Sequence, residues 1–145
     1  MQFNGEWMRC EDGVIRPVMR AEIRTSGNAW RSFELLVDTG ADRTVICASV
    51  LEDLQLPRLT SENQIGGIGG LARAVIVATT IRMFRDDGVD AVFRSEYMAC
   101  LDHESLDMSV LGRDILDMFA LVADRPRNIL AILGGKHGYA IEQRQ

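Results

Sequence analysis

The sequence contains few of the residues from which metal sites and disulfide frameworks are built. It has three cysteines, Cys10, Cys47 and Cys100, and two histidines, His103 and His137. An odd cysteine count without a C-x-x-C pair indicates neither a disulfide framework nor a zinc site, and no H-E-x-x-H motif occurs. We therefore expect no metal and no cofactor, with buried or half-buried thiols in a reducing compartment.

The chain also lacks the usual signs of membrane insertion and of nucleic-acid binding. No apolar stretch is long enough to span a bilayer, and charges occur early in MQFNGEWMRCED, so we see no signal peptide. Sixteen basic residues against 21 acidic ones give a net charge of −5, without a basic stripe interleaved with aromatics. We expect no membrane partner, no nucleic-acid partner and a cytoplasmic location.

What the sequence does contain suits one globular domain over residues 1–145. Hydrophobic residues make up 47% and charged residues 26% of its 145 positions, which is typical of a folded chain with a core. Residues 134–145 are expected to form a polar tail.

Turn-forming clusters separate β-prone segments along most of the chain. The clusters at 25–28, 85–88 and 124–127 are the clearest of them, and the Asp-Gly pair in the second is a strong hairpin signal. Many short strands with only two brief helices favour a closed or folded-over β-structure over alternating β-α units. We expect strands over 14–24, 29–37, 75–84, 89–100, 120–123 and 128–133, and helices over 48–54 and 111–119.

Residues 65–70 read Ile-Gly-Gly-Ile-Gly-Gly, a backbone with almost no side chains. Three interpretations compete: a surface turn, a phosphate loop, since residues 67–72 fit G-x-G-x-x-A, and a mobile hairpin tip that lies over an extended ligand. A phosphate loop needs a helix after it, whereas residues 74–81 are rich in β-branched types. The choice between turn and hairpin tip depends on the rest of the chain.

Asp38 directly follows the apolar run Leu35-Leu36-Val37. A carboxylate at the end of a buried strand is costly unless it is hydrogen-bonded or functional, so Asp38 is either a turn or cap residue or a catalytic acid on a rigid element. The pattern D-[ST]-G occurs once. Water-mediated attack on an amide needs two carboxylates, one as base and one as acid. A catalytic Asp38 therefore requires a two-fold homodimer.

Three motifs, in this order, resemble the retropepsins, the retroviral-type aspartic proteases. Residues 36–45, LVDTGADRTV, are similar to the active-site segment of that family, and residues 65–70 are similar to its flap tip. Residues 110–116, VLGRDIL, resemble its third signature, an apolar pair followed by Gly-Arg-Asp and a short helix. The resemblance implies an all-β acid-protease fold: a closed, barrel-like monomer with a flap hairpin and one or two short helices, active as a homodimer.

The resemblance also implies an aspartic endopeptidase that hydrolyses peptide bonds in extended peptide or protein substrates. Asp38 of both subunits would form the catalytic dyad, in which two close carboxylates share one proton. Thr39 would hold the two loops in register, and the carbonyl of Gly40 would reach a substrate N–H. Asp42 would contact the substrate main chain and pair with Arg113, which can meet a carboxylate bidentately.

The remaining implied site residues lie in the same three motifs. Ala41 completes the active-site loop, Val110 would line apolar subsites, and Gly112 and Asp114 would support the loop. The flap would offer main-chain groups to the substrate and close over it, and it comprises Ile65, Gly66, Gly67, Ile68, Gly69 and Gly70.

Three departures from the family pattern are visible. Residues 45–59 are expected to be helical over a longer stretch than in the retroviral enzymes, as in cellular and bacterial members. Arg43 is a large cation at the cleft edge that either favours acidic or polar substrate positions or is simply solvated. The terminal segments do not match the short strands of the retroviral dimer sheet, so the hairpin over 120–133 is the candidate to replace them.

Two other functions compete with the endopeptidase. The first is a retropepsin-like dimerisation or peptide-binding module with little turnover, against which the intact Asp38 motif and intact flap argue. The second is a serine hydrolase assembled from Asp102, His103 and Ser105, but no G-x-S-x-G motif accompanies them. A surface loop is the alternative interpretation of His103.

Overall fold

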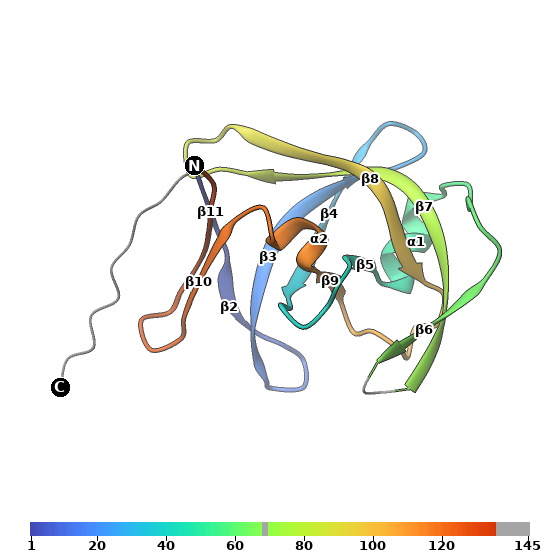
Figure 1. Cartoon of the computed structure of the whole chain (residues 1–145), viewed down its shortest axis with the longest axis horizontal. Coiled ribbons are helices and arrows are strands. Elements are labelled where there is room, and N and C mark those ends of the chain that lie inside the picture. The colour runs from blue at the N-terminus through green and yellow to red at the C-terminus, as the bar shows by residue number, and fades with distance from the viewer. Residues whose placement is uncertain (68–69, 136–145) are drawn as a thin grey trace.

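The computed structural model describes residues 1–67 and 70–135 and is mostly β-structure with two short helices (Figure 1). The helices are α1 (Ala48–Leu54) and α2 (Arg113–Leu116). The strands are β1 (Gln2–Asn4), β2 (Glu6–Arg9), β3 (Ile15–Arg24), β4 (Trp30–Val37), β5 (Val45–Ile46), β6 (Asn63–Gly67), β7 (Gly70–Phe84), β8 (Asp90–Cys100), β9 (Ser109–Leu111), β10 (Ala120–Asp124) and β11 (Ile129–Leu133). No helix in these ranges is long and apolar enough to cross a membrane.

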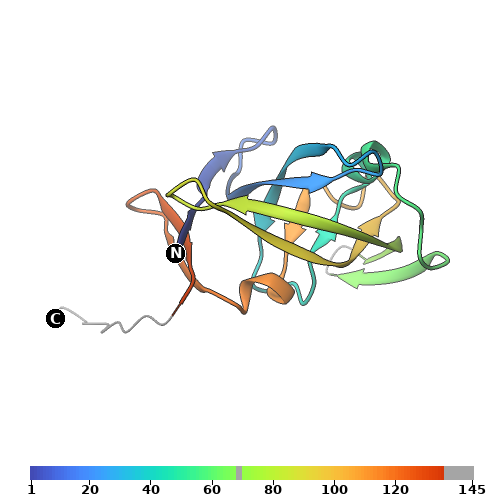
Figure 2. The same cartoon turned by 90° about the horizontal axis from the view of Figure 1, so that it is seen from above.

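The larger sheet closes on itself. Its eight strands run in the order β2-β3-β4-β9-β5-β8-β7-β6, and an additional pairing of β3 with β7 joins strands from its two halves. This extra pairing is antiparallel and matches Glu22 with Arg82 and Ile23 with Ile81. The long ribbon of β7 and β8 lies over β3, β4 and β9 when the molecule is seen from above (Figure 2). Closure leaves β2 and β6 as edges and gives the barrel-like shape.

A second, three-stranded sheet contains the first strand of the chain and the last hairpin, in the order β1-β11-β10. It is tied to the barrel by the Gly5 N–H, which donates to the Leu130 carbonyl at 2.9 Å, and by the Trp7 indole N–H, which donates to the Ile129 carbonyl at 3.0 Å. In Figure 1 the β10–β11 hairpin stands beside the barrel rather than within it.

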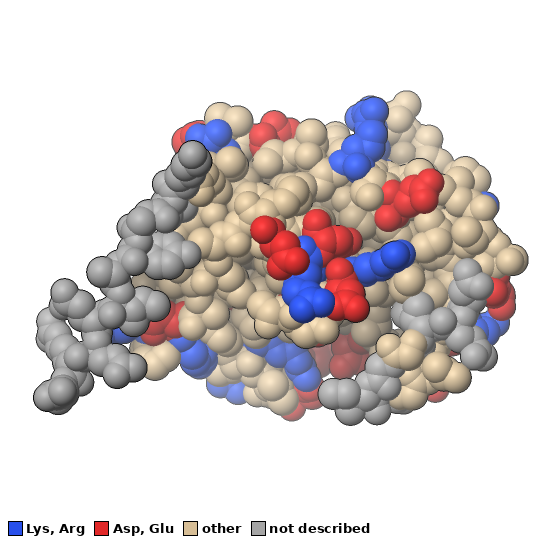
Figure 3. All heavy atoms as spheres, in the orientation of Figure 1, with Lys and Arg blue, Asp and Glu red and all other residues tan. Residues whose placement is uncertain are grey.

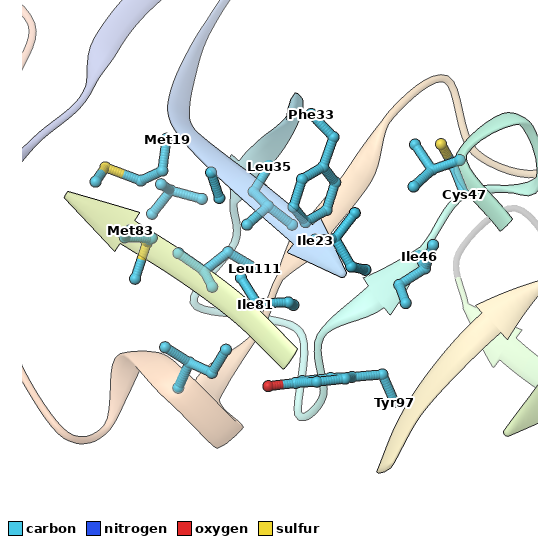
Figure 4. Packing of buried hydrophobic residues seen from close by; sticks show 14 of the residues in the cluster. Met19, Ile23, Phe33, Leu35, Ile46, Cys47, Ile81, Met83, Tyr97 and Leu111 are labelled. Carbon is cyan, nitrogen blue, oxygen red and sulfur yellow. The ribbon is translucent and has the colours of Figure 1, made fainter. Parts of the chain in front are cut away.

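The core is explained by the two-residue period of the strands. In β4 the side chains of Phe33, Leu35 and Val37 are buried, whereas those between them are more exposed. Ile81 of β7 and Leu111 of β9, the strand beside β4, belong to the same core (Figure 4). These apolar side chains are the main source of stability, at roughly 25 cal/mol per Å² of apolar surface buried.

Most of the expected elements are confirmed within a residue or two. The helix over 48–54 and the strands expected at 14–24, 29–37, 89–100, 120–123 and 128–133 all form, and the expected strand at 75–84 is the C-terminal part of the longer β7. The hairpins turn where predicted because Asn28, Gly88 and Asn128 adopt positive φ, the conformation that Gly and Asn tolerate best.

Several expectations about elements are wrong. The segment 45–59 is not helical throughout, because β5 occupies its start and α1 ends at Gln55, which has a left-handed conformation. The helix expected at 111–119 is regular only over α2, and single turns continue it to Phe119. No helix follows residues 67–72, which removes the phosphate-loop interpretation. Strands β1 and β2 were not anticipated.

Candidate active site

Asp38 lies immediately after β4, at the point where that strand leaves the core. Its backbone N–H donates to the Leu111 carbonyl at 3.2 Å, and its own carbonyl accepts from Ala41 N–H at 3.2 Å. The carboxylate accepts a hydrogen bond from Gly40 N–H at 2.9 Å and is half-exposed. The side chain is thus oriented by its own loop while one edge remains open to a ligand.

Gly112 permits a close approach of two remote backbone segments. A Cβ at this position would lie 2.3 Å from the Arg43 carbonyl carbon and 2.7 Å from Thr44 N. Both groups are main-chain atoms that cannot rotate away, so only glycine fits. The glycine of the third motif therefore serves to bring α2 against the loop that carries Asp38.

The junction is closed by a small polar network centred on Thr44 and Asp114. The Thr44 hydroxyl accepts from Gly112 N–H at 3.1 Å and donates to Asp114 Oδ1 at 2.7 Å. The same carboxylate oxygen accepts from Thr44 N–H at 2.9 Å and from Ile115 N–H at 3.0 Å. Thr44 is only 1% exposed, so these bonds satisfy donors that water cannot reach.

Asp42 and Arg113 form an ion pair on the outside of this junction. The backbone reinforces it, since Arg113 N–H donates to the Ala41 carbonyl at 2.9 Å and Asp114 N–H donates to the Asp42 carbonyl at 3.2 Å. Arg43 is exposed and has no ion-pair or hydrogen-bond partner for its side chain in the described part of the chain. Side chains of both signs gather at the centre of this face, over α2 and the adjoining loop (Figure 3).

The glycine-rich segment belongs to a hairpin of β6 and β7 whose register runs from Asn63 with Ala74 to Gly67 with Gly70. Gly70 has φ +106° and open space around it, and Gly66 is exposed. Ile65 pairs with Ala72 along the ladder. Ile68 and Gly69, two of the expected flap residues, lie outside the described residues.

Val110 lies beside Leu36, its Cα partner in the parallel pairing of β4 with β9. Both line a groove of about 1020 Å³ whose walls come from the β2–β3 hairpin and from the loop between β8 and β9. The groove therefore runs along the outer face of β4 as far as Leu36, two residues before Asp38.

The structure gives Asp102, His103 and Ser105 no triad geometry. Asp102 is bound by Arg73, with Nη2 to Oδ1 at 2.7 Å, and this contact lowers the pKa of the Asp102 carboxyl. His103 contacts Glu52 at 2.6 Å instead of Asp102. No hydrogen bond joins His103 to Ser105 among the described residues, which argues against the serine-hydrolase alternative.

The three cysteines are free thiols, half-buried at Cys10 and buried at Cys47 and Cys100. Burial raises the pKa of the Cys47 thiol, but hydrogen bonds with Ser109 and Ser49 outweigh it and leave that pKa below its ordinary value. No cluster of three or more His, Cys, Asp or Glu within residues 1–67 and 70–135 could hold a metal ion.

The structure thus brings together the first and third motifs, and it places the described part of the second on a separate hairpin. Thr39 and Gly40 are exposed at the loop apex. The sequence did not identify two features: the structural role of Thr44, and the groove that adjoins Leu36. A threonine directly after an Asp-Arg pair carries no signal until its partner 70 residues away is known.

Comparison with known proteins supports this arrangement. Residues 15–122 match the family described as retroviral aspartyl protease. That range contains the Asp38 loop, the β6–β7 hairpin and α2. No curated protein sequence matches the chain significantly.

Among solved structures, a retropepsin-like aspartic protease from Rickettsia conorii aligns over 91% of this chain and 90% of its own, with 19% identity and a TM-score of 0.57. EIAV protease in complex with the inhibitor HBY-793 covers 70% of this chain and 86% of its own, with 25% identity and a TM-score of 0.49. Simian foamy virus (mac) protease covers 68% and 92%, with 18% identity and a TM-score of 0.39. The Rickettsia structure supports the same fold.

Proposed function

The chain belongs to the retroviral aspartyl protease family, and on that premise we propose that it is an aspartic endopeptidase that works as a homodimer. One observation carries the proposal: Asp38 lies at the end of a buried strand with its carboxylate oriented by Gly40 N–H and one edge open. A rigid element that presents a fixed, accessible carboxylate is what acid-base catalysis needs.

The homodimer follows from the number of carboxylates. Each chain supplies one Asp38, whereas water activation needs one group to take a proton and another to give one. A two-fold axis next to the loop apex would bring two copies together in an isologous contact. The exposed Thr39 hydroxyl has no hydrogen bond in the described part of the chain and is available to the partner's loop.

In the proposed reaction the two carboxylates share one proton. The ionised carboxylate takes a proton from a bound water as the water oxygen attacks the scissile carbonyl carbon. The protonated carboxylate donates its proton to the carbonyl oxygen. When the tetrahedral intermediate breaks down, the amide nitrogen leaves with a proton returned from the dyad, and no covalent enzyme intermediate forms.

The hairpin of β6 and β7 would act as the flap. Its strand β6 is the last in the sheet order and, among the described strands, pairs with β7 alone, so it can swing without breaking other ladders in that part of the chain. Closure would exclude water and offer main-chain hydrogen bonds to an extended substrate. The bare backbone at Gly66 and Gly70 leaves room for that approach.

The test is cleavage of a diverse peptide mixture by wild type and by Asp38→Asn, from about pH 4 to 7, the span over which a shared proton is expected. Asp117→Asn is the matched control, because Asp117 is exposed next to α2 and its side chain forms no ion pair with any other described residue. Protein concentration is kept high so that a weak dimer stays assembled.

Cuts made by wild type and Asp117→Asn but not by Asp38→Asn support the aspartic mechanism. Equal cutting by all three proteins would show that Asp38 is not the catalyst. Absence of cutting by a dimer, verified by sedimentation, would favour the peptide-binding module instead.

A further inference from the structure

Glu34, Leu36 and Asp38 form a line of alternate residues along β4 and just beyond its end. Phe33, Leu35 and Val37 point into the core, so the alternate strand residues Glu34 and Leu36 point outward on one face, and Asp38 follows directly after the strand. At roughly 3.3 Å per residue, Glu34 lies roughly 13 Å from Asp38 along the strand, with Leu36 between them.

The groove beside this line is apolar near Asp38 and acidic farther away. Its apolar part is formed by Leu36, Val110 and Met108. Val110 is 7% exposed and Leu36 is half-buried, so they form a floor rather than a flexible rim. Beyond this floor the groove is lined by Glu34 and Asp107.

The charges that line the groove do not balance. Five carboxylates face two guanidiniums, a surplus of three negative charges. The guanidinium of Arg16 is already held by Asp12 at 2.6 Å, and that of Arg9 donates to the Gly13 carbonyl at 3.1 Å. The carboxylates without an ion pair or hydrogen bond in the described part of the chain are Glu11, Glu104 and Asp107.

Glu34 is the groove carboxylate nearest to Asp38 along the chain, and the one ion pair that it forms within residues 1–67 and 70–135 is loose. Arg20 approaches it at 3.4 Å but lies closer to Glu6, at 2.7 Å, and is 67% exposed. Glu34 is therefore accessible to a cation in the groove, since the Glu34 side chain is 37% exposed.

Resting on the proposed function, we propose that this groove selects a lysine or arginine of the substrate at a position next to the scissile bond. These side chains combine an apolar stem with a cationic head. The stem would pack on Leu36 and Val110, and the head would reach Glu34 and Asp107. The specificity is thus for basic positions rather than for wholly apolar segments.

Two properties distinguish this groove from an ordinary solvated acidic surface. Its floor includes Leu36, two residues before Asp38 in the chain, and this proximity would place an occupant of the groove near the reacting bond. Its lining combines the apolar side chains of Leu36, Val110 and Met108 with carboxylates, so a lysine gains from burial of its stem as well as from charge. An aspartate or glutamate in the substrate would be repelled there.

The experiment uses a peptide that wild type cleaves, remade with lysine, norleucine or glutamate at the residue on each side of the scissile bond in turn. Norleucine matches the lysine stem without its charge. The readout is the ratio of kcat/KM for lysine over norleucine. The variants are Asp107→Asn, which leaves no partner unpaired, and Glu34→Gln. Glu96→Gln, exposed on β8 and outside the groove, is the matched control.

In wild type we expect a lysine-to-norleucine ratio of about ten or more at one of the two positions, with glutamate the poorest. Asp107→Asn and Glu34→Gln should each lower this ratio about three- to fivefold, in line with partly exposed charge pairs. Glu96→Gln should leave it unchanged. A ratio near one in wild type, or a ratio that neither groove variant changes, would overturn the proposal.

A separate peptide-binding measurement distinguishes failure of this inference from failure of the proposed function. Fluorescence anisotropy of the same peptides with Asp38→Asn protein, and with Asp38→Asn combined with Asp107→Asn, measures selection without cleavage. Absence of cleavage in every peptide would refute the endopeptidase but not the groove, if lysine peptides still bind more tightly than norleucine peptides. Equal binding of the two would refute the groove even where cleavage occurs.

Discussion

The loop that carries Asp38 and the hairpin of β6 and β7 both face the substrate in the proposed enzyme, but they are held in opposite ways. The loop is bound to a segment 70 residues away through Thr44, Gly112 and Asp114. In the hairpin, β6 pairs with β7 alone among the described strands, because β6 ends the sheet. In the proposed enzyme, long-range contacts would thus hold the catalytic loop fixed, and β6 would be free to move with few contacts to break.

The largest effect should come from filling the space at Gly112. Gly112→Ala would place a Cβ 2.3 Å from the Arg43 backbone, so the two segments must separate. We expect a loss of about 4 kcal/mol in the free energy of unfolding, at the upper end of single substitutions. Urea denaturation followed by circular dichroism measures it.

Gly27→Ala is the matched control for that substitution. Its Cβ would meet only Thr25 Oγ1, at 3.9 Å, so a change within about 1 kcal/mol is expected. Equal effects at the two glycines would mean that the close approach at Gly112 is not what holds the loop.

The next effect should come from the Thr44 hydroxyl. Thr44→Val removes the acceptor of Gly112 N–H and the donor to Asp114, and it leaves a buried N–H without a partner. We expect a loss of about 2 kcal/mol, measured by the same urea titration, together with reduced peptide cleavage. Thr80→Val is the control, since Thr80 is 8% exposed and its hydroxyl has no hydrogen bond within the described ranges.

In the β6–β7 hairpin, a substitution that strains the backbone should destabilise the hairpin more than the rest of the molecule. Gly70→Ala forces a β-carbon into φ +106°, at a cost of about 1–2 kcal/mol. Because only β7 holds β6, we expect faster amide hydrogen exchange in β6 with a much smaller shift in the global unfolding midpoint. A global loss as large as that of Gly112→Ala would mean that the two regions are not held differently.

The smallest effect concerns the groove wall, where Arg16 lowers the pKa of Asp12 from 3.8 to about 2. Because the folded pKa lies below the unfolded one, the stabilisation is fully present above about pH 4 and is lost as the pH falls toward 2. Thermal melting at pH 5 and pH 2.5 should show a slightly larger drop for wild type than for Asp12→Asn. The difference should shrink at high salt, since the pair is solvent-exposed.

The candidate site residues differ in how far their surroundings could be predicted from the sequence. The sequence alone was enough to select Asp38 and its loop as candidate site residues. A carboxylate directly after an apolar run is rare, and Asp38-Thr39-Gly40 belongs to a recognisable pattern. The pairing of Asp42 with Arg113 was expected and is present. His103 was considered as part of a triad, but its partner Glu52 lies on α1, 51 residues away, and no local pattern indicates it.

The two strands at the N-terminal end illustrate the same limit. Gln2–Asn4 and Glu6–Arg9 are short and mixed in polarity, so their periodicity is too weak to identify them. They form because β11 and β3 offer unpaired backbone groups to them. Such strands depend on the neighbours that they complete.

By itself the sequence determined the turns, helix α1, the alternation that buries one face of β4, and the position of Asp38 at the end of that strand. These features depend on backbone dihedral preferences and on the spacing of apolar residues within a few positions. Only the tertiary structure decided that Gly112 meets Arg43, that Thr44 binds Asp114, and that Glu34, Leu36 and Asp107 line one groove. Those arrangements join residues tens of positions apart, and the closure of the barrel brings them together.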